Sequence, residues 1–115
     1  MVSWRLPEWR QRKTSLTLKN SWTGQPFGTG AAIAELSNGT VRLGGAIASG
    51  TAPLAFKLPS TLRPAADVYV QVDLCDATNG RLLITPNGKV SVEEEGGGLA
   101  NADCFTSLDG ASFVP

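Results

Sequence analysis

Turn-forming residues interrupt this chain so often that a long helix has no room to form. From residue 31 onward, clusters rich in glycine, proline and asparagine recur at intervals of roughly eight to twelve residues. The apolar pattern between them never reaches the roughly ten to twelve residues by which a helix is recognised. The 115 residues include 13 glycines and 7 prolines without a fixed period. We therefore expect one small all-β domain, built as a sandwich or a barrel.

Three short motifs predict how the strands are connected. Asn38-Gly39 and Pro86-Asn87-Gly88 are expected to form hairpin turns, because asparagine and glycine accept positive φ angles. Gly44-Gly45 predicts a bulge or a close backbone approach. Four apolar residues in strict alternation are expected to face the core: Val68, Val70, Val72 and Leu74. The predicted strands are 15–19, 31–36, 41–48, 54–58, 68–74, 81–85, 89–93, 104–108 and 111–114.

The net charge of zero conceals a basic N-terminal segment. Residues 1–20 contain five basic residues and one acidic residue, which gives +4, whereas residues 21–115 contain five basic and nine acidic residues, which gives −4. A basic segment ahead of an acidic body is typical of an attachment arm. We therefore divide the chain into an arm, residues 1–20, and a β domain, residues 21–115.

All three tryptophans lie at this end of the chain, at Trp4, Trp9 and Trp22. Tryptophan and arginine are the residues most enriched at interface hot spots. The predicted anchoring residues are Trp4, Arg5, Trp9, Arg10 and Arg12. The alternative interpretation is that a terminal strand packs its tryptophans against the domain's own core.

Several kinds of catalytic and metal chemistry find no support in the sequence. The chain has no histidine, the commonest general base and metal ligand, and two cysteines alone cannot form a structural zinc site. The run Glu93-Glu94-Glu95 is interpreted as a solvated charge run. A calcium site was considered at Asp73, Asp76, Asp103 and Asp109, but the spacing matches no known calcium loop. We expect no enzyme activity, no metal and no cofactor.

Cys75 and Cys104 are each placed at the end or the start of a predicted strand. One interpretation is a disulfide that closes the segment between them. The other is a pair of buried free thiols, which pack as small apolar side chains. Both interpretations stay open at the level of sequence, although the even count favours the disulfide.

A series of short motifs follows in a distinctive order through residues 27–115. They are Thr40-Val41-Arg42-Leu43-Gly44-Gly45, Leu58-Pro59, Leu62-Arg63-Pro64, Asp67-Val68-Tyr69-Val70, Gly80-Arg81-Leu82, Ile84-Thr85-Pro86-Asn87-Gly88-Lys89-Val90 and Thr106-Ser107-Leu108-Asp109-Gly110-Ala111-Ser112-Phe113. This order resembles a phage module, the C-terminal β-sandwich of tail-fibre tips, baseplate receptor-binding proteins and other virion appendages. The resemblance implies a jelly-roll-like antiparallel β-sandwich of eight or nine strands, assembled as a homotrimer on the virion surface. Several relatives bind host surface saccharides, and the family offers no catalytic residues to carry over.

Two functions are weighed on this basis. The leading hypothesis is a non-enzymatic capsid decoration protein, a homotrimer held to the major capsid protein or another virion protein through residues 1–20. The alternative is a receptor-binding tip whose loops, 76–80 and 94–102, bind a host surface glycan. These loops contain no aromatic residue, which favours decoration.

The sequence gives no support for a secreted protein, a nucleic-acid partner or a membrane-spanning segment. A secreted domain similar to C1q or tumour necrosis factor is disfavoured, because the N-terminus lacks the apolar stretch of a signal peptide. We expect no nucleic-acid partner. A membrane-spanning segment is not expected either, because no run of about 18 apolar residues occurs.

Overall fold

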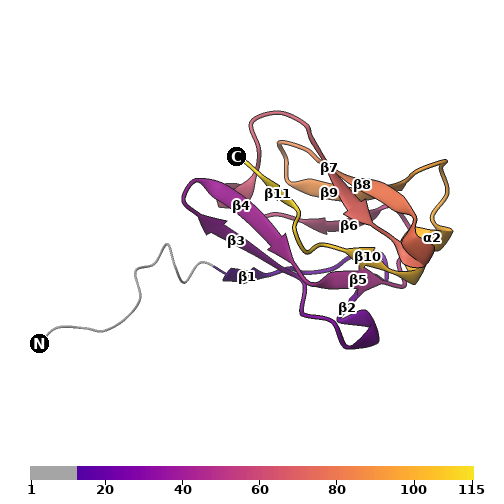
Figure 1. Ribbon diagram of the computed structural model, residues 1–115. Helices are drawn as coiled ribbons and strands as arrows, with labels where there is room; N and C mark the ends of the chain where they lie inside the picture. Colours follow the sequence, from indigo (N-terminus) through magenta and orange to yellow (C-terminus); the bar gives the residue numbers. More distant parts are fainter. Residues whose placement is uncertain (1–12) are drawn as a thin grey trace, which may run out of the picture.

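The computed structural model describes residues 13–115, which form an antiparallel β-sandwich (Figure 1). One layer is a four-stranded sheet in the order β6 (Leu54–Lys57), β9 (Lys89–Glu94), β8 (Asn79–Ile84) and β7 (Val68–Asp73). The other layer contains a four-stranded sheet in the order β1 (Lys13–Ser15), β3 (Ile33–Ser37), β4 (Thr40–Gly44) and β11 (Ser112–Phe113). A separate three-stranded sheet has the order β10 (Thr106–Ser107), β5 (Ala46–Ala48) and β2 (Thr23–Gly24), and β5 directly follows β4 along the chain. The expected all-β sandwich fold is confirmed.

Helical structure within residues 13–115 is confined to short segments in the connections. They are the 3₁₀ turns η1 (Pro26–Gly28), η2 (Ser60–Leu62) and η3 (Cys75–Ala77) and the helix α2 (Ala100–Cys104). No helix in this part of the chain is long and apolar enough to cross a membrane.

Gly45 is the point at which β4 gives way to β5. Its φ is +84°, and a side chain there would overlap the carbonyl oxygen of Ala31. Its N–H donates to Asp109 Oδ1 at 2.8 Å, so the amide is satisfied from outside the strand ladder. The close approach predicted at Gly44-Gly45 therefore occurs, and it divides the single strand expected over 41–48 into two.

The two predicted turns also have the expected geometry. Asn38 and Gly39 adopt φ angles of 52° and 76°, and they connect β3 to β4 in antiparallel register. Gly88 adopts φ 88° in the turn between β8 and β9. In both turns the positive φ is what asparagine and glycine tolerate and other residues resist.

The core lies between the two layers and is almost entirely apolar. Val72 and Leu74 are buried as predicted, whereas Val68 and Val70 are only partly buried against the core, because β7 is the edge strand of its sheet. Trp22 is 4% exposed, and its Nε1–H donates to the carbonyl oxygen of Ala52 at 2.8 Å. For this tryptophan, core packing replaces the surface role considered from the sequence.

The N-terminal part of the described chain belongs to the sandwich. Residues 13–15 pair with β3, and Leu16 and Leu18 pack against the core. The strand expected over 15–19 is therefore displaced toward the N-terminus. The attachment role of residues 1–20 stays a prediction, because residues 1–12 lie outside the described part of the chain.

The expectation of a strand over 104–108 and of a domain without any helix was wrong. Residues 100–104 form α2, and only Thr106 and Ser107 pair, with Ile47 and Ala46. The strand count is also higher than expected, with eleven strands in residues 13–115, because several pairings extend over only two or three residues. Such short pairings leave no alternation in the sequence to detect.

Gly50 packs directly beneath the Trp22 ring, where an added Cβ would overlap the indole. Replacing Gly50 by alanine should overpack the core and lower the melting temperature by about 5 °C or more. Gly30→Ala is the matched control, because its Cβ would meet only Gly45 Cα, at 3.8 Å. Thermal unfolding followed by circular dichroism measures both. Equal melting temperatures for the two variants would contradict this account of the Trp22 packing.

Candidate functional site

The outer face of the β7–β8–β9 sheet contains a groove with a volume of about 940 Å³. Strand alternation places its side chains there, since Leu82, Val90 and Val92 point into the core and their neighbours point outward. Residues from all three strands and from the loop after β9 line the groove. They are Tyr69, Gln71, Asn79, Gly80, Arg81, Leu83, Ser91, Val92, Glu93, Glu94, Glu95, Gly96, Gly97 and Gly98, and Pro53, just before β6, also lines the groove.

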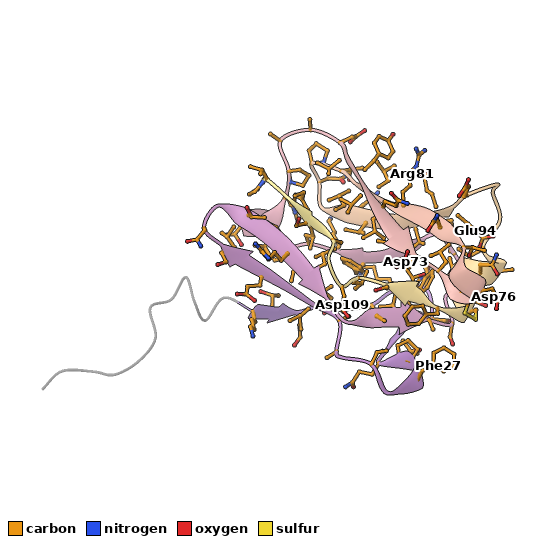
Figure 2. The ribbon with its side chains drawn as sticks, viewed as in Figure 1. Phe27, Asp73, Asp76, Arg81, Glu94 and Asp109 are labelled. Atoms are coloured by element: carbon orange, nitrogen blue, oxygen red, sulfur yellow. A yellow bond between two sulfur atoms is a disulfide. The ribbon has the colours of Figure 1, made fainter. Side chains whose placement is uncertain are left out.

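Three side chains form the centre of the groove. The Arg81 guanidinium carbon lies 4.4 Å from the centroid of the Tyr69 ring, and Arg81 Nε donates to Glu93 Oε1 at 2.7 Å. Arg81 projects from the sheet away from the body of the sandwich (Figure 2). Tyr69 remains 56% exposed although Arg81 stacks on it. Exposed pairs of this kind contribute only about 0–1 kcal/mol to folding, so their main effect is to orient the side chains.

The glycine loop at one rim of the groove is held by a carboxylate. Gly96, Gly97 and Gly98 have φ angles of 85°, 84° and 85°, a conformation in which a side chain would be strained. Just before them, Glu94 Oε1 accepts the N–H groups of Asn101 and Ala102 at 2.8 and 3.0 Å. Glu94 thus ties the end of β9 to the start of α2, whereas the sequence interpretation placed it in a solvated charge run.

The far end of α2 is tied down by a disulfide. Cys75 and Cys104 are bonded, with 5.8 Å between their Cα atoms, so the structure contains the first of the two alternatives left open by the sequence. The bond joins the β7–β8 connection to the end of α2. The two loops near this end of the sheet are therefore linked to each other as well as to the strands.

The four aspartates considered as a calcium site do not come together. Asp109 accepts the Gly45 N–H at the junction of β4 and β5, and Figure 2 shows Asp76 at another edge of the molecule. Within residues 13–115 no group of three or more histidine, cysteine or acidic residues is placed to hold a metal ion. The calcium site therefore finds no support in the structure.

The predicted site residues fall into two groups. The predicted anchoring residues, Trp4, Arg5, Trp9, Arg10 and Arg12, lie outside the described residues. The loops 76–80 and 94–102, predicted to face a receptor, contribute only Asn79, Gly80 and the stretch 94–98 to the groove.

Sequence reasoning missed Tyr69 and Arg81 as site residues. Tyr69 alternates with Val68 and Val70 and was therefore expected to face outward, but the sequence did not indicate that its strand pairs with the strand of Arg81. For Arg81 and Glu93 the available signal was the hairpin predicted at Pro86-Asn87-Gly88, which places them on neighbouring strands.

Loss of the Glu94 carboxylate should loosen the loop that forms the rim. Glu94→Ala is expected to lower the free energy of unfolding by about 1–2 kcal/mol, because two N–H groups at the start of α2 lose their acceptor. Glu95→Ala, at an exposed neighbouring position, should change stability by less than about 0.5 kcal/mol. Urea unfolding measures both variants. A Glu95 variant as unstable as the Glu94 variant would argue against the proposed anchoring.

Comparison with known proteins links this chain to one group by its fold. Neither a scan against protein-family models nor a search of curated proteins found a significant match. Among solved structures, the chain is similar to the receptor binding protein (gp15) of Listeria phage PSA, with a TM-score of 0.70 and 20% sequence identity. The match covers 89% of this chain and 63% of that chain, so this chain spans less than two thirds of its length. The predicted resemblance to a phage appendage module is thus confirmed at the level of the fold.

Proposed function

We propose that this domain is a non-enzymatic receptor-binding module on the surface of a phage virion, and that the groove over Tyr69 contacts the host. One observation supports this above the others: an exposed tyrosine, a paired arginine and several polar side chains share a 940 Å³ groove. This groove belongs to a sandwich similar in fold to a phage receptor binding protein.

The chemistry of the groove suits a host surface glycan. Tyrosine and arginine are enriched among residues that dominate binding energy, because they offer large area and directed hydrogen bonds. Gln71, Asn79 and Ser91 add amide and hydroxyl groups, which can both donate and accept. The aromatic residue missing from the loops is supplied by strand β7, and this favours receptor binding over decoration.

The groove is also well ordered for binding. Its central residues stand on strands paired in continuous antiparallel register, with Arg81 opposite both Gln71 and Glu93. Rigid placement lowers the conformational entropy lost when a ligand binds. This supports a preformed binding surface and a binding role rather than a catalytic one.

Capsid decoration is the second candidate function, favoured by the +4 charge of residues 1–20. In either case we propose that the part of this segment ahead of β1, residues 1–12, attaches the domain to the major capsid protein or another virion protein. Homotrimer assembly is proposed on the resemblance to phage appendage modules. Receptor binding is preferred because the groove has no role in a purely decorative protein.

The groove can be tested by removing its central side chains. Tyr69→Ala and Arg81→Ala should each weaken binding of the labelled protein to host cells by about tenfold or more, since each removes a hot-spot side chain. Lys57→Ala, an exposed position that does not line the groove, should bind like the original protein. Melting temperatures should stay within a few degrees. Host binding that survives both groove substitutions would refute the assigned surface.

The N-terminal segment is tested by deletion of residues 1–12. The shortened protein should keep its fold and its binding to host cells but should no longer join the virion. Trp4→Ala and Trp9→Ala should weaken attachment more than Lys13→Ala, because a desolvated aromatic typically contributes about 2 kcal/mol or more and a rim charge contributes little. Immunoblotting of purified particles measures incorporation. Normal incorporation of the shortened protein would rule out the anchoring role.

A further inference from the structure

The groove is acidic even though an arginine lies at its centre. Among its lining residues, the single basic residue Arg81 is accompanied by Glu93, Glu94 and Glu95, which gives +1 − 3 = −2. Arg81 is already paired with Glu93 at 2.7 Å. The exposed carboxylate of Glu95 stands next to the glycine loop at the rim. The electrostatic environment offered to a ligand is therefore negative.

The negative environment bears on whether Arg81 is available to bind an anionic ligand. A free guanidinium often clamps a phosphate or a carboxylate through two parallel hydrogen bonds. Here the charge of Arg81 is balanced by Glu93, so an incoming anion would compete with that carboxylate for the same cation. Glu95, a further negative charge, also lines the groove. Both effects disfavour an anionic ligand.

A hydroxyl group, unlike an anion, suits the hydrogen-bonding groups of the groove. It donates and accepts at once, so adjacent hydroxyls can take hydrogen bonds from the Arg81 terminal N–H groups and donate to the free oxygens of Glu93 and Glu95. An anion only accepts, and it would leave these carboxylates without a donor. The side chains of Gln71, Asn79 and Ser91 are equally suited to hydroxyl groups.

We infer that the groove selects an uncharged, hydroxyl-rich saccharide unit and discriminates against units bearing phosphate or carboxylate, with Glu93 and Glu95 as the residues that set this preference. The inference rests on the proposed function, because it concerns the ligand of the same groove. It goes further by naming the charge class of that ligand and the side chains that reject the other class.

The test uses nuclear magnetic resonance of the ¹⁵N-labelled full chain with two sets of probes at millimolar concentration. The neutral probes are methyl glycosides of common hexoses and N-acetylhexosamines, and the acidic probes are the corresponding 6-phosphates and uronic acids. At least one neutral glycoside should shift the Arg81 Nε–H and Gly97 N–H signals. Its acidic counterparts should bind about three- to tenfold more weakly at low salt.

Matched variants connect the preference to Glu95. In Glu95→Gln the affinity gap, that is, the ratio of the affinities for neutral and acidic probes, should narrow to about twofold or less. In the unsubstituted protein, raising the salt concentration from about 0.05 to 0.5 M should also narrow this gap, because salt screens the charges. Glu35→Gln, on strand β3 of the other layer, should leave the gap unchanged.

The outcomes separate this inference from the proposed function. Acidic probes that bind the groove as tightly as neutral ones, or a gap unaffected by Glu95→Gln, would overturn the charge preference and leave the groove as the binding site. Failure of every neutral probe to shift the groove signals would also overturn it. Saccharide binding that persists in Tyr69→Ala would place the binding site elsewhere. That result would contradict the proposed function of the groove itself, whatever the charge preference of the protein.

Discussion

Burial of the apolar face of β7, β8 and β9 holds every side chain of the outer groove in place. Leu82, Val90 and Val92 are at most 1% exposed, and the residues next to them in the sequence must point to the opposite side. A shift of one residue in the pairing would expose these apolar side chains and bury Arg81 and Glu93 instead. The free-energy cost of exposing the apolar side chains and burying the charged ones keeps the strands in this register. The geometry of the groove therefore depends on the core behind it.

The rim of the groove depends on different interactions, because it has little core of its own. Helix α2 is too short to be stable alone, and it is held by the Glu94 carboxylate at one end and by the Cys75–Cys104 bond at the other. Between Glu94 and α2 lies a stretch of glycines with positive φ. The loop thus has fixed ends, and its three glycines carry no side chains, which leaves their backbone open to close approach.

Function and stability are separated between the two faces of one sheet. The inner face supplies the apolar area that a small domain requires. The outer face contains the exposed ring of Tyr69 and the Arg81–Glu93 ion pair, which contribute little to folding and which we propose to contact the host. The charge preference that we infer for the groove rests on the acidic residues around Arg81 and requires no change in the scaffold.

The sequence alone determined those features that depend on neighbouring residues. The turns at Asn38-Gly39 and Gly88, the close approach at Gly45 and the strands of the β7–β8–β9 sheet all follow from local φ preferences and period-two alternation. Helix α2 was missed because its stability comes from Glu94 and from a disulfide rather than from its own five residues.

Only the tertiary structure decided which polar residues meet. Arg81 and Glu93 are 12 residues apart, and Tyr69 lies on a third strand, so pairing register alone brings them together. It also decided that Trp22 fills the core, because the space for its ring is created by Gly50 on a distant segment. Local patterns show which way a side chain faces. Its partners depend on how the strands align, and that alignment is set by burial across the whole sandwich.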